Sequence, residues 1–478
     1  MQSACGVPTC HGSGRVRILP ARWKRGGDGP TARVRTSVGP RPCISGARAH
    51  HSRPTLLHTE PGAAEVSASE GLLDGVLHRL IRTGELGVIW PDGRTSRYGP
   101  GGEPSARLRI ADSATARAIL LNPALRFGEA YMDAKLTPVD CSIYQVLDVL
   151  LASMGSGAAH PLAAVLDRGS FWLRRLLQWN TPHQARRHVA HHYDLNGRLY
   201  ALFLDRDRQY SCGYFPRGDE TIEQAQAAKK RHIAAKLCLD RPELSVLDIG
   251  CGWGGLALHL AREHGALVLG ITLSSEQLQV ARDRALAEGL DQRVRFELLD
   301  YRAVGESFDR VVSVGMFEHV GIPNYETFFR TVGQRLRPDG VGLVHAIGRS
   351  EGPEETNAWL RKYIFPGGYS PALSEVLGPL ERSGLKLCDL EILRLHYAET
   401  LRHWRRRFAA NRDAIASLYD ERLCRMFEFY LAGSELAFRR QGHMVWQAQL
   451  AHQFDAVPLA RDYITDADRA TSPQSTGV

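Results

Sequence analysis

The residues best suited to chemistry lie in a glycine-rich turn, VLDIGCGWGG, at 246–255. A hydrophobic run ends there and a helical pattern begins, so the glycines let the backbone turn tightly and approach a ligand closely. The N-terminus of the following helix favours a carboxylate or a phosphate. Asp248 precedes the glycines Gly250, Gly252 and Gly254, and no Lys-Ser or Lys-Thr pair follows. The spacing therefore disfavours nucleotide triphosphate chemistry. The turn is interpreted either as a ligand-binding turn or as a purely structural one.

The pattern D-x-G-x-G-x-G resembles the first motif of class I S-adenosylmethionine-dependent methyltransferases. In that class the turn meets the methionine carboxylate of the cofactor. The second strand of such proteins commonly ends in an acid that binds the ribose hydroxyls. Here the corresponding segment, GITLSSEQ at 270–277, has Thr272 at that point. Ribose recognition would therefore use hydroxyl and amide groups such as Thr272 and Gln277.

These residues need a scaffold, and the hydrophobic pattern predicts an α/β fold. Helical patterns near 253–264, 275–288 and 324–336 separate a series of apolar runs. The apolar runs lie at 244–250, 266–273, 294–299, 308–315 and 341–348. Strands that alternate with helices in this way indicate a doubly wound, Rossmann-like methyltransferase sheet. Helical insertions, one further strand (387–395) and long helices (398–415 and 418–440) are expected after it.

A smaller α+β N-terminal domain is expected before this sheet. Its helical patterns lie at 72–86, 115–136 and 142–153. A strand and turn are expected at 87–93 and a strand at 106–112. The predicted organisation has four parts. They are a disordered basic extension over 1–68, an accessory domain for lipid contact or dimerisation over 69–170, a catalytic domain over 180–460 and a flexible tail over 461–478.

The net charge of +8 over 478 residues invites a nucleic-acid or membrane function, but its distribution argues against the first. Residues 1–60 hold ten Lys or Arg and only two acids, which leaves 50 basic and 50 acidic residues in the rest of the chain. This Gly/Pro/Ser-rich start is typical of a flexible extension or of a start codon assigned too far upstream. A neutral body without a recognition motif disfavours nucleic-acid binding.

The cysteines indicate a reducing compartment. Nine are present without paired spacing, and neither a CxxC pair nor an HExxH motif occurs. No metal site is therefore predicted, and the expected location is the cytoplasm.

Motifs spread over 180–455 resemble, in their order, those of the cyclopropane-fatty-acyl-phospholipid synthases. They are HYDLNGRLYALFLD, YSCGYF, VLDIGCGWGG, GITLSSEQ, LLDYR, FDRVVSVGMFEHVG, LVHAIG, KYIFPGG, HYAETLRHWRRRF and RMFEFYLAGSELAFR. The resemblance implies transfer of a methyl group from S-adenosylmethionine to a cis double bond of an acyl chain. Loss of a proton then closes a cyclopropane ring, and a bound bicarbonate ion is the implied base. A related lipid methyltransferase that forms a methyl- or methylene-branched fatty acid is the alternative.

The resemblance also implies which residues form the sites. The positions that match the catalytic bicarbonate site are Cys212, Glu318, His345, Ile347 and Tyr397. Of these, His345 and Tyr397 can donate hydrogen bonds to an anion, and Glu318 can accept one. The positions that match cofactor contacts are Tyr210, Ser211, Asp248, Gly250, Gly252, Gly254, Thr272, Leu273, Gln277, Tyr301 and Arg302. Tyr210 and Trp253 also offer aromatic faces to the sulfonium.

Each catalytic position has a structural alternative. His345 could be a buried structural histidine, Glu318 a helix cap and Tyr397 a core residue. Ser434 stands where family members often have cysteine, which argues against a mechanism that uses that thiol.

The segment RHWRRRF at 402–408 places five cations around Trp404. It is interpreted either as a solvated helix face or as a patch for anionic phospholipid headgroups. The expected partners are phospholipid acyl chains at the inner face of the membrane, where the enzyme would bind peripherally, and a second copy of the chain in a homodimer. No nucleic-acid partner is expected.

Overall fold

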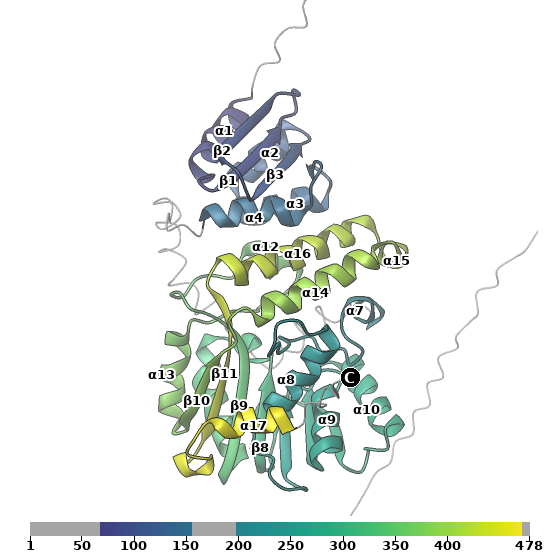
Figure 1. Cartoon of the computed structure of the whole chain (residues 1–478), viewed down its shortest axis with the longest axis vertical. Coiled ribbons are helices and arrows are strands. Elements are labelled where there is room, and N and C mark those ends of the chain that lie inside the picture. Colours follow the sequence, from purple (N-terminus) through teal and green to yellow (C-terminus); the bar gives the residue numbers. More distant parts are fainter. Residues whose placement is uncertain (1–66, 155–196, 471–478) are drawn as a thin grey trace, which may run out of the picture. The chain divides into compact units, whose positions relative to one another are not determined.

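The computed structural model describes residues 67–154 and 197–470 (Figure 1). The predicted basic extension lies outside the described residues except for its last two positions. Residues 155–196 also lie outside them, and these include the end of the predicted accessory domain and the start of the predicted catalytic domain. Within the described ranges, no helix is long and apolar enough to cross a membrane.

The N-terminal part contains a four-stranded sheet in the order β2-β1-β3-β4. Its strands are β1 (Gly84–Ile89), β2 (Thr95–Gly101), β3 (Ser105–Ile110) and β4 (Leu136–Pro138). Neither β2 nor β4 was predicted from the sequence. Its helices are α1 (Ala68–Leu80), α2 (Ser113–Leu121), α3 (Pro123–Met132) and α4 (Ile143–Met154). The single helix predicted over 115–136 is two helices, because the Asn122 side chain accepts a hydrogen bond from Leu125 N and Pro123 begins a new helix.

The larger sheet has seven strands in the order β10-β11-β9-β8-β5-β6-β7. They are β5 (Ser245–Ile249), β6 (Leu267–Thr272), β7 (Val294–Leu298), β8 (Phe308–Val314), β9 (Leu336–Arg349), β10 (Lys386–Ile392) and β11 (His443–Ala451). Strands β5 to β9 pair in parallel, and β11 runs antiparallel between β9 and β10. The predicted Rossmann-like α/β fold class is confirmed, although strand β11, second from one edge of the sheet, was missed.

Helices cover both faces of this sheet, as a doubly wound fold requires. On β5, Val246 packs into a cluster with α8 (Ile222–Lys236), α9 (Gly255–His264) and α10 (Ser275–Ala287). The next residue, Leu247, packs into a cluster on the opposite face with α11 (Tyr325–Arg335) and α13 (Leu373–Ser383). Because both faces are covered, the strands read as continuous apolar runs.

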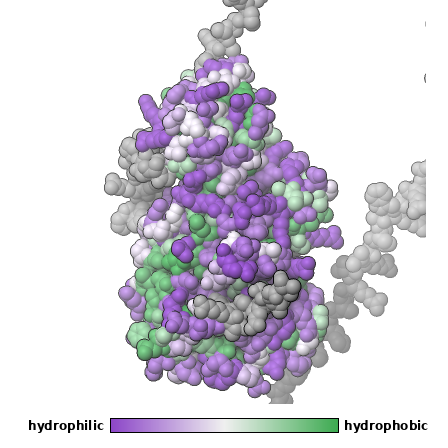
Figure 2. Space-filling view, viewed as in Figure 1, coloured by the Kyte–Doolittle hydropathy of each residue, from purple (hydrophilic) through white to green (hydrophobic). Residues whose placement is uncertain are grey.

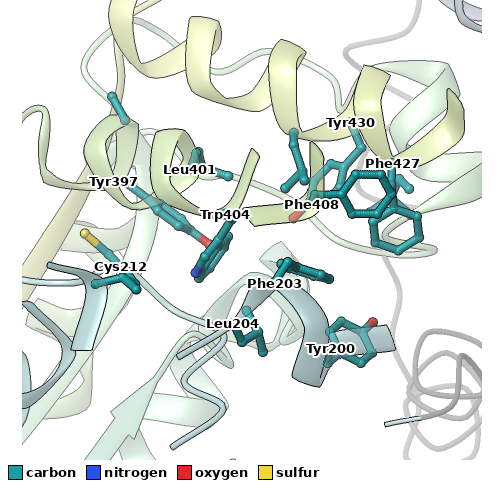
Figure 3. Packing of buried hydrophobic residues seen from close by; sticks show 14 of the residues in the cluster. Tyr200, Phe203, Leu204, Cys212, Tyr397, Leu401, Trp404, Phe408, Phe427 and Tyr430 are labelled. Carbon is teal, nitrogen blue, oxygen red and sulfur yellow. The ribbon is translucent and has the colours of Figure 1, made fainter. Parts of the chain in front are cut away.

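Five helices outside the sheet layers surround a third cluster, which is rich in aromatic residues (Figures 1 and 3). They are α7 (Gly197–Phe203), α12 (Ala358–Tyr363), α14 (His396–Ala410), α15 (Arg412–Leu418) and α16 (Glu421–Arg440). Helix α16 packs against α14 and also against α3 and α4 of the N-terminal part.

The flexible tail predicted over 461–478 is wrong for its first half. Helix α17 covers Asp462–Ala470, and Ile464 on it is buried. The Gln449 side chain donates a hydrogen bond of 2.6 Å to the Tyr463 hydroxyl, and Arg461 pairs with Asp389 at 2.8 Å. These contacts hold the segment against α8 and β10.

The cationic segment 402–408 is built into helix contacts. Trp404 is fully buried. Arg405 donates to Glu435 at 3.0 Å and lies over the Tyr144 ring at 4.2 Å, so it links α14 to both α16 and α4. Arg407 pairs with Glu223, and Arg402 pairs with Glu399. Hydrophilic residues dominate the surface over α14, whereas hydrophobic ones gather over α13 and β10 (Figure 2).

We expect Arg405→Met to lower the free energy of unfolding by about 1–3 kcal/mol, because Glu435 is almost completely buried and loses one of its partners. Arg406→Met is the matched control, since Arg406 is exposed on the same helix. Chemical denaturation of both variants checks this. Equal destabilisation by the two substitutions would contradict the assigned role of Arg405.

Candidate active site

The glycine turn adopts a conformation that glycine favours. Gly250, Gly252 and Gly254 all have positive φ, at 84°, 54° and 84°. The amides of Gly250 and Cys251 both donate to Ile271 O, at 2.9 and 3.0 Å, which fixes the turn to the end of β6. A Cβ on Gly254 would lie 2.7 Å from Phe296 Cζ, so that glycine is needed for packing. A Cβ on Gly252 would meet no described atom within 4 Å, so this glycine faces open space where a ligand could approach.

Asp248 is a buried acid behind this turn. Its Oδ2 has no hydrogen-bond partner in the described part of the chain. Burial raises the pKa of Asp248 to about 7, and the nearby Lys229 opposes the increase. Such a carboxylate, near the carboxyl end of the parallel strand β5, suits a cationic ligand.

The two residues predicted to bind ribose are in direct contact. Thr272 Oγ1 donates to Gln277 Oε1 at 2.9 Å, and both side chains are buried at the end of β6. The Ser274 hydroxyl caps α10 by accepting from Gln277 N at 3.2 Å. Leu273, between Thr272 and Ser274 in the chain, is half-buried.

The two residues predicted to flank adenine follow β7. Arg302 forms a bidentate pair with Asp300, with both distances at 2.7 Å. The Tyr301 ring belongs to the core cluster under α11, with its centroid 5.4 Å from that of Phe328. Burial raises the pKa of Tyr301 to about 12.

Tyr210 and Ser211 come from a segment that is anchored by α8 and by the aromatic cluster. The Tyr210 ring stacks on Trp404 at 5.3 Å, and its hydroxyl is 2.9 Å from that of Tyr430. The Tyr200 ring lies between Tyr210 and Trp253, at 5.2 and 5.4 Å, which connects the cluster to the glycine turn. The Ser211 hydroxyl accepts from Lys229 Nζ at 2.8 Å.

Glu318 and Ile347, two of the predicted bicarbonate residues, form a direct hydrogen bond. Glu318 Oε1 accepts from Ile347 N at 2.7 Å. The other oxygen, Oε2, is buried without a partner among the described residues. Burial raises the pKa of Glu318 to about 7. Tyr369 N donates to Glu318 O at 2.9 Å and holds the backbone in place.

His345 lies two residues before Ile347 on β9 and is also buried. The amide nitrogen of Gln447 on β11 lies 3.0 Å from His345 Nδ1. In this orientation Nδ1 accepts and the ring proton is on Nε2, which remains a donor. Burial, with Lys229 and Lys236 nearby, holds the pKa of His345 well below its usual value, so the ring is neutral.

Cys212 and Tyr397 belong to the aromatic cluster, and Ile347 packs against it (Figure 3). The Tyr397 ring meets Trp404 edge-on at 5.8 Å. Burial raises the pKa of the Cys212 thiol, which donates to Gly213 O at 3.2 Å. Contacts therefore connect Glu318, Ile347, Cys212 and Tyr397, and His345 shares a strand with Ile347.

Two side chains near these groups were missed from the sequence. Gln447 lies on the unpredicted strand β11, and Lys229 lies within AAKKRH, which resembles a solvated helix face. Both are about 1% exposed. A signal for Lys229 was its position seven residues before Lys236, which puts two lysines on one face of α8.

The parallel sheet, with a glycine turn after β5 and a buried acid before it, is that of a class I S-adenosylmethionine-dependent methyltransferase. Residues 180–448 match the family model described as mycolic acid cyclopropane synthetase, and residues 74–160 match a domain of unknown function. The chain belongs to this cyclopropane synthase family, which confirms the resemblance found in the motifs.

Similar proteins support this assignment. The chain is 37% identical over 348 residues to cyclopropane-fatty-acyl-phospholipid synthase of Escherichia coli K12. The aligned region covers 72% of this chain and 88% of that protein. It is 42% identical over 260 residues to a probable fatty acid methyltransferase of Pseudomonas putida, which covers 53% of this chain and 66% of that protein. The solved structure of mycolic acid cyclopropane synthase CmaA1 with SAH and CTAB matches with a TM-score of 0.53 and 31% identity, over 57% of this chain and 99% of that one.

We expect Gly252→Ala to weaken the binding of S-adenosylhomocysteine about tenfold or more while the protein stays folded, because the new methyl group enters the open space at the turn. Gly289→Ala is a matched control: its φ is 65° and its Cβ also meets nothing within 4 Å, but it lies between α10 and β7. Both substitutions should cost about 1–2 kcal/mol of backbone strain. Calorimetric titration would contradict the placement of the ligand if both variants bound equally well.

We expect Glu318→Gln to stabilise the cofactor-free protein at about pH 8, by up to about 3 kcal/mol. The pKa of Glu318 is about 7 in the folded protein and 4.5 in the unfolded chain. As the pH rises through this window, the unfolded chain releases the proton more readily than the folded protein does, and the free energy of unfolding falls. Below about pH 4 both states are protonated and the gain should disappear. Denaturation at both pH values tests this.

Glu326→Gln serves as the control of opposite sign, because Arg382 lowers the pKa of that partly exposed carboxyl. Loss of the Glu326 charge should slightly destabilise the protein at the higher pH. An equal gain for Glu318→Gln at both pH values would contradict a buried ionisable carboxyl.

Proposed function

We propose that this enzyme transfers a methylene group from S-adenosylmethionine to a cis double bond of unsaturated acyl chains in membrane phospholipids. The product is a cyclopropane ring, and a bound bicarbonate ion is the base. The observation that carries this proposal is Glu318, whose one carboxylate oxygen is held by Ile347 N while the other is buried and available.

The cofactor fits the residues at the glycine turn. Gly252 leaves space for it, and the unpartnered Oδ2 of Asp248 suits its cationic groups. When bound, S-adenosylmethionine supplies an electrophilic methyl group. Thr272 and Gln277 would hold its ribose, and Tyr301 and Arg302 its adenine. Tyr210 and Trp253 contribute aromatic faces close to the turn, where a sulfonium is favoured.

Bicarbonate would be held by Glu318 and His345. When bound, it supplies a base for the proton that the alkylated chain must lose. Ionised Glu318 would accept a hydrogen bond from its hydroxyl through Oε2, and the Nε2–H of neutral His345 would donate to its oxygens. Tyr397 offers a further donor, while Cys212 and Ile347 would contribute backbone groups.

The aromatic cluster suits a reaction that passes through a carbocation on the acyl chain. Methyl transfer breaks the carbon–sulfur bond and leaves positive charge on the neighbouring carbon, and loss of a proton lets the ring close. Trp404 and Tyr430 belong to this buried cluster (Figure 3), and Tyr210 contacts both of them. Their aromatic faces would favour a cation, and their burial would keep water away from it. The Cys212 thiol stays protonated, since burial raises its pKa, so it does not compete as a nucleophile.

The second candidate is a methyl- or methylene-branched product. The similarity to a probable fatty acid methyltransferase supports it. The ring and a methylene branch share the cation and the loss of one proton, and they differ in where the released electron pair forms the new carbon–carbon bond. A saturated methyl branch would in addition take up a hydride from an external reductant.

The substrate also suggests a location and an assembly. A phospholipid substrate would place the enzyme at the inner face of the membrane, bound peripherally. The homodimer through the N-terminal part stays a prediction.

We expect Glu318→Gln to reduce turnover about 10²-fold or more, while S-adenosylhomocysteine binds as in the parent protein. When the parent protein is expressed in a host that lacks such an enzyme, mass spectrometry should show that the lipids gain one CH2 and lose the reactivity of the double bond. Fragments that indicate a branch would favour the second candidate. Glu326→Gln is the matched control and should keep full activity. Undiminished turnover in Glu318→Gln would refute the anion site.

A further inference from the structure

Gln447 and His345 face each other across two neighbouring strands. Strands β9 and β11 run antiparallel, and their register places Gln447 directly opposite His345. Side chains of opposite residues in such a pair lie next to each other on the same face of the sheet. Gln447 Nε2 is 3.0 Å from His345 Nδ1, and both residues are almost completely buried. The register of the sheet therefore brings the two side chains together.

The pair lies on the face of the sheet that α8 covers. Leu343, two residues before His345, packs into the cluster that contains α8, and Gln449, two residues after Gln447, donates to Lys236 O of that helix at 2.6 Å. Burial, with the positive charges of α8 nearby, holds the pKa of His345 well below its usual value. The ring is therefore neutral and has a single N–H.

The chemistry of the side chain at 447 decides which ring nitrogen carries that proton. The amide nitrogen of Gln447 can only donate, so His345 Nδ1 accepts and the proton is on Nε2. A carboxylate at the same position could only accept. It would place a proton on Nδ1, and in the neutral ring the lone pair on Nε2 could then take up another proton. A glutamine at this position thus makes the ring a donor and leaves it without a free lone pair.

We propose that Gln447 is a positioning residue that holds His345 as a hydrogen-bond donor toward the bound anion, so that the ring is not itself the base of the reaction. The proton that the alkylated chain loses then goes to the anion, because both nitrogens of the ring are engaged. The inference rests on the proposed bicarbonate site at Glu318 and His345.

Nuclear magnetic resonance of the full chain, made with isotope-labelled histidine, tests the position of the proton in the cofactor-free protein. Hydrogen–nitrogen correlation spectra distinguish a protonated ring nitrogen from an unprotonated one, and His345→Asn identifies the signal. We expect the parent protein to carry the proton on Nε2 alone at neutral pH. Gln447→Glu should place a proton on Nδ1. Gln449→Glu, which adds the same charge two residues along the same face, should leave Nδ1 unprotonated.

An uncharged pair of variants tests the effect on the anion. We expect Gln447→Met to raise the concentration of sodium bicarbonate at half-maximal turnover about fivefold, because the ring loses the partner that orients it. The KM for S-adenosylmethionine should stay unchanged. Gln449→Met removes an equally buried amide and should change the bicarbonate dependence by less than about twofold, even where it lowers the melting temperature. In the parent protein, sodium bicarbonate should also shift the Nε2–H signal of His345.

Four results would overturn the proposal. A proton on Nδ1 in the parent protein would mean that Gln447 accepts through its oxygen. An unprotonated Nδ1 in Gln447→Glu would mean that residue 447 does not set the position of the proton. Equal effects of Gln447→Met and Gln449→Met would mean that only packing matters. An Nε2–H signal that does not respond to sodium bicarbonate would instead place the error in the proposed anion site.

Discussion

The hydrogen bond from Ile347 N to Glu318 is the contact on which the arrangement of the site depends. Glu318 follows β8, and Ile347 lies in the neighbouring parallel strand β9. The bond satisfies one carboxylate oxygen and leaves the other fixed and buried. It also sets Glu318 beside the cluster that contains Cys212 and Tyr397, because Ile347 packs against that cluster. A slip of β9 by one residue would move both Ile347 and His345 to the other face of the sheet.

Burial has a common effect on the ionisable groups of this region. It raises the pKa of Asp248 and of Glu318 to about 7, and it lowers the pKa of Lys229 to about 8. Each group is therefore close to its titration midpoint near neutral pH, which is typical of functional sites. Such burial opposes folding, and the sheet that is packed on both faces supplies the stabilisation that offsets it.

The sequence predicted those features that depend on local pattern. The turn at Gly250–Gly254 and the parallel strands follow from continuous apolar runs, and their positions agree with the structure. Strand β11 was missed because Gln447 and Gln449 interrupt its apolar run. Both are buried by partners that are distant in the chain, His345 for one and Lys236 O for the other. Lys229 was missed, and the surroundings of Trp404 were misjudged, for the same reason: the helix faces that carry them are covered by segments that local periodicity does not reveal.

Helix α16 connects the two parts of the molecule to the same cluster. Its Tyr430 contacts Tyr210, which is linked through the Tyr200 ring to Trp253 of the glycine turn. Its Glu428 accepts from Tyr131 of α3 at 2.7 Å. Arg405 on α14 adds the link through Glu435 to Tyr144 of α4. Cations that resemble a surface patch in the sequence thus join the N-terminal part to the aromatic residues around the site. Helix α16 therefore packs on α3 and α4 with one face and carries Tyr430 into the aromatic cluster around the site with another.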